Sequence, residues 1–211
     1  MFGTHDLALF VVSGLLLNIT PGPDSLYIVA RSSSQGWRAG AAAALGIATG
    51  CYVHILAAAL GLSALLATSA FAFSLLRWVG GAYLVYVGIS MLRSTGRQNT
   101  ASLASLAPIS LRQIFFQGFL TNVLNPKVGL FFLAFVPQFI DPSAPNKALA
   151  FLFLGVIFNI NGTLWCLFLA WSAAMLSQRM SFANRMAAWL NRMTGLMFLY
   201  LGFKLFFARE S

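Results

Sequence analysis

The stretch from Asn18 to Asp24, Asn-Ile-Thr-Pro-Gly-Pro-Asp, interrupts the first long apolar segment of the chain. Residues 7–17 are almost wholly apolar, and the apolar run resumes shortly after the interruption. Proline removes a backbone donor and clashes with the preceding turn, so a continuous helix is disfavoured here. A break at membrane depth persists only where protein or a water-filled cavity surrounds it. The sequence therefore predicts a helix broken at Pro21 and Pro23, with the carboxylate of Asp24 as a functional-site candidate. A proline kink without function is the alternative.

Composition assigns the chain to the membrane. Of its 211 residues, 59% are hydrophobic and 8% are charged, whereas a soluble domain carries about 25% charged residues. Residues 1–211 are therefore expected to form a single transmembrane domain. Six apolar segments reach the roughly 20 residues that a spanning helix needs. They lie near 7–30, 39–66, 70–92, 112–136, 147–176 and 187–208.

The polar stretch after Arg93 divides the chain into two repeats, about 7–92 and 112–208, that share short motifs. The matching positions are Gly14 and Asn18 with Gly118 and Asn122, Leu45-Gly46 with Leu154-Gly155, and Gly81, Tyr86 and Gly88 with Gly195, Tyr200 and Gly202. Three segments per repeat is an odd number, so the two repeats must lie inverted in the membrane. The predicted fold is an all-α integral membrane protein of six helices in two inverted three-helix repeats, with helices one and four broken.

The basic residues predict the orientation. One set of loops and helix ends carries eight of them: Arg31, Arg38, Arg93, Arg97, Arg112, Arg179, Arg185 and Arg192. The other carries four: Arg77, Lys147, Lys204 and Arg209. The positive-inside rule then places both termini outside the cytoplasm, in the periplasm of a bacterial cell. The basic residues are spread over loops and helix ends and form no patch, so nucleic acid is not an expected partner.

A second break lies in the fourth segment and mirrors the first. Asn125 can cap a new half-helix and Pro126 suits its first position, and Thr20 with Pro21 can do the same in segment one. Two half-helix N-termini that face a shared midplane would form a cradle for an anion. Lys127 in a first helical turn opposes the helix dipole and is buried as well, so we expect it to have a function. Snorkelling of this lysine to water is the alternative.

Three other polar residues within the apolar segments are weaker candidates. His54 could relay protons, although it could equally be a packing residue. Asn159 and Asn161 could bind a substrate or join helices by hydrogen bonds. The glycines of the second segment are expected to allow helices to approach closely.

These motifs resemble a known family. Thr20–Asp24, Ala44–Gly50 with His54, and Asn125–Lys127 followed by residues 130–139 are similar to the LysE/RhtB family of bacterial amino-acid exporters. The similarity covers essentially the whole chain. It implies efflux of amino acids or close derivatives across the bacterial inner membrane, driven by proton exchange. The homoserine, threonine and leucine branch is the most similar, but the substrate does not carry over from the branch.

The residues fit such a substrate on chemical grounds. An amino acid needs one site for its carboxylate, which the two helix N-termini and Lys127 suit, and one for its ammonium, which Asp24 suits. The expected substrate-binding residues are Thr20, Gly22, Asp24, Asn125, Lys127, Asn159 and Asn161, and the proton-coupling residues are Asp24 and His54. The expected partners are a neutral amino acid, protons and the lipid bilayer. No cofactor or metal is expected, and the sequence leaves a homo-oligomer open.

Three other classes of protein compete with this interpretation. A metal-ion exporter would need more ligands at the midplane than Asp24 and His54 supply. A thiol-redox transporter would place cysteines beside the breaks, whereas Cys51 and Cys166 lie in segments two and five. A membrane enzyme would need a nucleophile and base cluster, and Ser25 near Asp24 is the one pair of this kind. The sequence does not fix whether the direction of transport is export or uptake.

Overall fold

The computed structural model describes residues 2–63 and 107–175 together with nine single positions: Trp78, Ala82, Val85, Tyr86, Ile89, Leu92, Leu196, Leu199 and Tyr200. Within this part of the chain the regular elements are helical, apart from one isolated β-bridge between Thr4 and Ile140. Most of the third and sixth predicted segments lies outside the described residues. So do the glycines of their shared motif and most of the loop arginines that predict the orientation.

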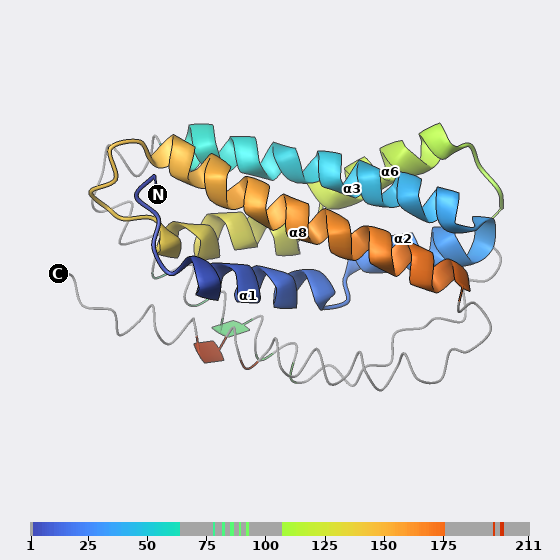
Figure 1. Ribbon diagram of the computed structural model, residues 1–211, viewed down its shortest axis with the longest axis horizontal. Coiled ribbons are helices and arrows are strands. Elements are labelled where there is room, and N and C mark those ends of the chain that lie inside the picture. The colour runs from blue at the N-terminus through green and yellow to red at the C-terminus, as the bar shows by residue number, and fades with distance from the viewer. Residues whose placement is uncertain are drawn as a thin grey trace.

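The helices of the described part run back and forth along the long axis of the molecule (Figure 1). In chain order they are α1 (Leu7–Ile19), α2 (Pro23–Gln35), α3 (Trp37–Ala57), η1 (Ala58–Leu62), α6 (Leu111–Val123), α7 (Pro126–Leu130), η3 (Phe131–Phe135), η4 (Val136–Phe139) and α8 (Lys147–Met175). Gly36 adopts a φ of 81° between α2 and α3. This left-handed conformation suits glycine and lets the chain reverse direction.

The first predicted break is confirmed, because α1 and α2 are separate helices that meet at a bend of 52°. The predicted cap at this break is wrong. Gly22 is the extended residue before α2, and Pro23 rather than Pro21 occupies the first turn. The Thr20 hydroxyl instead donates 2.6 Å back to the Leu16 carbonyl of α1. Thr20 therefore belongs to the end of the first half-helix and not to the start of the second.

The second predicted break is confirmed together with its cap. The side chain of Asn125 accepts a hydrogen bond of 3.0 Å from the Lys127 N–H, and Pro126 begins α7. The bend between α6 and the segment Pro126–Phe139 is 44°. Asn125 thus satisfies one N–H that the start of a helix leaves without a partner.

Two continuous helices are long and apolar enough to cross a membrane, Trp37–Leu62 with 26 residues and Lys147–Met175 with 29 residues. The two bent pairs described above each pass the same test as one interrupted span. The protein is therefore a multi-pass helical membrane protein. Its arrangement as six spans in two inverted repeats stays a prediction.

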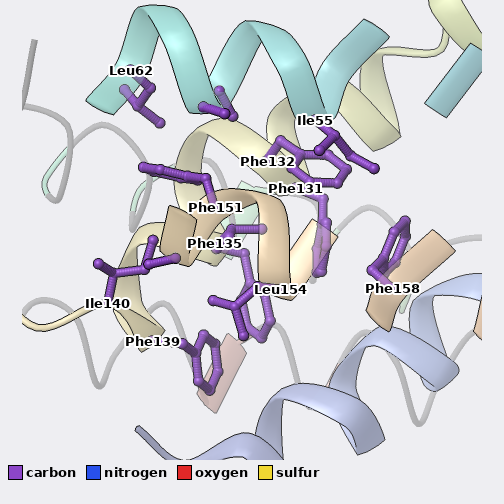
Figure 2. Close-up of a cluster of buried hydrophobic side chains, with 14 of the residues drawn as sticks. Ile55, Leu62, Phe131, Phe132, Phe135, Phe139, Ile140, Phe151, Leu154 and Phe158 are labelled. Atoms are coloured by element: carbon purple, nitrogen blue, oxygen red, sulfur yellow. The ribbon is translucent and has the colours of Figure 1, made fainter. Parts of the chain in front are cut away.

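Two apolar clusters hold the described helices together. The larger is rich in phenylalanine and joins α1, α3, η1, η3, η4 and α8. Figure 2 shows side chains from α3, η1, η3, η4 and α8 gathered in this cluster. Phe131 and Phe158 stack there with ring centroids 4.5 Å apart. The smaller cluster joins α2, α3, α6 and α8 and contains Ile28, Ile47 and Ile114 among small residues.

Helices α3 and α6 make the most extensive contact in the described part of the chain, and glycines permit it. A Cβ atom on Gly118 of α6 would lie 2.6 Å from the Ala43 carbonyl oxygen of α3. A Cβ atom on Gly50 of α3 would lie 2.6 Å from the Phe119 carbonyl oxygen of α6. Such positions exclude any side chain, which confirms that the glycines of this segment serve close helix approach.

Candidate functional site

A polar cavity lies between the two breaks, enclosed by α1, α2, α3, α6, α7 and α8. Its volume is about 50 Å³, roughly three to five times the space that one ordered water needs. Its polar wall is made of Asn18, Asp24, Asn122, Asn125, Lys127 and Asn159. Gly22, Asp24 and Ser25 come from the start of α2, and Asn125, Lys127 and Val128 come from the start of α7. Both half-helices therefore begin at this one cavity.

One of the two carboxylate oxygens of Asp24 has a hydrogen-bond partner. Its Oδ2 accepts a hydrogen bond of 2.7 Å from Asn122 Nδ2, which joins α2 to α6. Its Oδ1 is buried and has no hydrogen-bond partner within the described residues. The same holds for Asn18 Nδ2 and Asn122 Oδ1, which belong to two other residues of the cavity wall.

These three polar atoms form the clearest sign of a binding site. A buried polar atom without a partner costs about 1–3 kcal/mol, so such atoms are rare without a reason. Here two acceptors and one donor belong to residues that line the same small cavity. This arrangement suits a ligand that carries both hydrogen-bond donors and acceptors.

Lys127 is bound by the end of the first half-helix. Its Nζ donates to the Leu17 carbonyl at 2.7 Å and to the Thr20 carbonyl at 2.8 Å. The last carbonyls of a helix lack partners and carry partial negative charge, so they can compensate a cation. No ion pair joins Asp24 to Lys127 in the described structure. The carbonyls at the end of α1 compensate part of the ammonium charge, and a substrate carboxylate as a further partner of Lys127 stays a prediction.

Three of the predicted site residues do not line the cavity. The side chain of Thr20 is turned back to α1, as described above. Asn161 lies two residues after Asn159, about 200° around α8, so the two cannot share a face. His54 donates 2.9 Å from Nε2 to the Asn122 carbonyl oxygen and stacks on Phe132 with ring centroids 6.4 Å apart. His54 therefore contacts the backbone of a cavity residue without lining the cavity itself.

Other cavity residues are only weakly indicated by sequence patterns. Asn18 and Asn122 served as markers of the repeat, yet an amide within an apolar span is itself a candidate for buried polar contacts. Cys51 of α3 and Cys166 of α8 also line the cavity, although they lie far from the breaks in sequence. Among the described residues, no group of three or more His, Cys, Asp or Glu side chains could hold a metal ion.

Fold and site together define a class of protein. Membrane helices that are broken near a shared polar cavity, with an ionisable residue at each break, are a feature of many transporters. The family model of the LysE type translocators matches residues 15–209. The chain belongs to this family, which confirms the resemblance predicted from its motifs.

Several curated proteins are similar along almost their whole length. An uncharacterized membrane protein of Pseudomonas aeruginosa is 34% identical over 206 residues, which cover 96% of this chain and 95% of the relative. Homoserine/homoserine lactone efflux proteins of Salmonella typhi and Salmonella typhimurium are each 30% identical over 211 residues, covering 96% of both chains. No solved structure matches the chain.

Proposed function

We propose that the protein exports neutral amino acids or their derivatives, with homoserine as the leading candidate, across the bacterial inner membrane in exchange for protons. The family and the efflux function named for the two Salmonella relatives support export. The excess of arginine on one side of the predicted spans supports an orientation with both termini in the periplasm.

The observation that carries this proposal is the unpaired Oδ1 of Asp24 in the cavity wall. A substrate ammonium can donate to this oxygen and to the unpaired Oδ1 of Asn122. The resulting bonds would be charge-assisted and roughly twice as strong as neutral ones. No other bond in the described structure uses these two oxygen atoms.

The charges around the cavity favour a neutral amino acid. Asp24 and Lys127 are the charged residues in its wall, one of each sign. A zwitterion adds no net charge to this balanced pair, whereas a cationic amino acid would add one buried charge without a partner. Burying an unpaired charge is expensive, so lysine and arginine should be poor substrates.

The carboxylate end of the substrate is proposed to face the two half-helix N-termini. The N–H groups at the start of α2 near Gly22 and of α7 near Asn125 carry partial positive charge. Asn18 Nδ2 is a donor without a partner there, and Lys127 adds positive charge. Asn159 also lines the cavity, and its Nδ2 donates a hydrogen bond of 3.2 Å to the Ala48 carbonyl.

Proton exchange is proposed to follow from competition for Asp24. Among the described residues that line the cavity, Asp24 is the one acid. It can hold either a proton or the substrate ammonium, and binding of one then favours release of the other. Such mutual exclusion produces antiport if the site changes the side to which it opens only while it holds a proton or the substrate. His54 is a second proton-coupling candidate that would act through its contact with Asn122.

Uptake into everted membrane vesicles tests the proposal. These vesicles turn export into accumulation, and respiration makes their interior acidic. Labelled homoserine, threonine, leucine and lysine should be compared with and without a protonophore. We expect accumulation of homoserine that the protonophore abolishes, and little accumulation of lysine. Accumulation that is unaffected by the protonophore, or transport of none of the neutral amino acids, would contradict the proposal.

A further inference from the structure

The first break leaves carbonyl oxygens that need a positive partner. Helix α1 ends at Ile19, and the carbonyls of its last turn have no N–H ahead of them in the helix. The Leu16 carbonyl accepts from the N–H and the hydroxyl of Thr20. The Leu17 and Thr20 carbonyls accept from the ammonium of Lys127 instead. One cation thus provides the hydrogen-bond donors for two carbonyls at the end of this half-helix.

Such carbonyl groups form the cation sites of many secondary transporters. In those proteins, unwound backbone carbonyls and half-helix C-termini coordinate a free sodium ion at the break of a helix. In this protein the corresponding position, beside the bend between α1 and α2, is taken by a cation that belongs to the chain. The ammonium lies 2.7 and 2.8 Å from the two oxygens, which are distances of strong charge-assisted hydrogen bonds.

We propose that the Lys127 ammonium is a tethered cation that occupies a monovalent-cation site at the first break and makes transport independent of sodium. In this role Lys127 is a positioning residue, because two of its three N–H donors are bound to the protein itself. This assignment rests on the proposed function where transport is measured. The measurement of stability described below does not depend on any substrate.

The surroundings of Lys127 agree with a fixed cation. A Cβ atom on Gly22 would lie 3.7 Å from both Cδ and Nζ of Lys127, so the lysine packs along the backbone of the break. Its own backbone N–H is held by the Asn125 cap at the second break. Lys127 therefore connects the two breaks, and a rearrangement at one break is transmitted to the other through this side chain.

The test is chemical rescue of Lys127→Met. Methionine matches the lysine side chain as far as Cε and lacks the ammonium, so the two carbonyls lose their donor. The purified variant should unfold at a Tm lower than that of the wild type by roughly 5 °C or more. Ammonium chloride should restore about a third of this loss or more, in a saturable way, because a cation that binds only the folded state stabilises it. Choline chloride at equal ionic strength should not.

Lys147→Met is the matched control, because Lys147 lies at the start of α8 and takes no part in the break. Its Tm should respond equally to ammonium and choline. An unchanged Tm in Lys127→Met, or a Tm that ammonium and choline raise equally, would overturn the assignment.

The transport measurement uses everted vesicles. Wild-type homoserine accumulation should be the same in sodium and in choline media. Counterflow of labelled homoserine in de-energised Lys127→Met vesicles does not need the proton gradient, which ammonium would dissipate. Its rate should fall at least roughly tenfold and recover partly with ammonium, as expected for a lost positioning group. A wild type that requires sodium would overturn the assignment, and this result is available even if the variant does not fold. If ammonium rescues the Tm while the wild type transports no amino acid, the cation site stands and the proposed function fails.

Discussion

Asp24→Asn is the substitution that separates substrate recognition from folding most cleanly. In the structure the carboxylate accepts one bond of 2.7 Å from Asn122 and leaves the other oxygen to the cavity. An amide of the same size can still accept from Asn122 through its oxygen, so the fold should lose only about 1 kcal/mol. The cavity, however, loses its negative charge.

The loss of charge sets the magnitude of the expected effect on transport. A charge-assisted hydrogen bond contributes about 1.5–3 kcal/mol, against about 1 kcal/mol for a neutral one. Loss of the whole contribution weakens substrate binding roughly 10- to 150-fold. The amide in Asp24→Asn cannot carry a proton in exchange for the substrate. Accumulation of homoserine against its gradient should therefore also disappear.

Two assays on proteoliposomes resolve the two roles. Counterflow of labelled homoserine measures binding without proton coupling, and its half-saturation concentration should rise by the factor given above. Accumulation driven by a pH gradient measures coupling and should be absent. Asp141→Asn is the matched control, because this exposed loop carboxylate is bound only by Ser143, whose hydrogen bonds hold its pKa below the usual range.

The outcome of these assays can refute the reasoning in two ways. Normal accumulation by Asp24→Asn would show that the carboxylate carries neither the proton nor the ammonium. Unchanged counterflow with lost accumulation would restrict Asp24 to proton coupling and remove it from substrate binding.

Three further substitutions or fusions test separate parts of the structure. Gly118→Ala should lower Tm by roughly 3–10 °C through overpacking against α3. Gly61→Ala is the control and should leave Tm unchanged, because nothing lies within 4 Å of its Cβ position. Equal changes of Tm in the two variants would contradict the close contact of α3 and α6. A reporter that is active only in the cytoplasm should be silent when fused after Ser211, and a strong signal would reverse the orientation. In a Cys51→Ser background, homoserine should slow alkylation of Cys166 by a small thiol reagent severalfold, and an unchanged rate would place this cysteine outside the binding site.

The two breaks could be predicted from the sequence because proline acts locally. Pro126 with its Asn125 cap was predicted correctly, since nothing nearby competes for the cap. At the first break two prolines follow one another closely, and either Pro21 or Pro23 could begin the new helix. The Thr20 hydroxyl bonds to the preceding helix, which decides in favour of Pro23. Sequence alone does not reveal that competition.

The partners of buried groups could not be predicted in the same way. The direction in which a side chain points depends on how each helix is rotated against its neighbours, and local sequence does not encode that rotation. Cys51 and Cys166 thus reach the cavity from α3 and α8, although they lie far from both breaks in the chain. Lys127 contacts backbone carbonyls 110 and 107 residues away, a contact that arises only when the fold brings the start of α7 near the end of α1.

The central claim is that one cavity, with Asp24 in its wall, exchanges a neutral amino acid for a proton. It is tested most directly by proteoliposomes that hold homoserine and a trapped pH-sensitive dye. Dilution into medium without homoserine creates an outward gradient. In the wild type, homoserine should leave while protons enter and the interior acidifies, and Asp24→Asn should show no acidification. Homoserine efflux at the full wild-type rate with no change of internal pH would contradict the account.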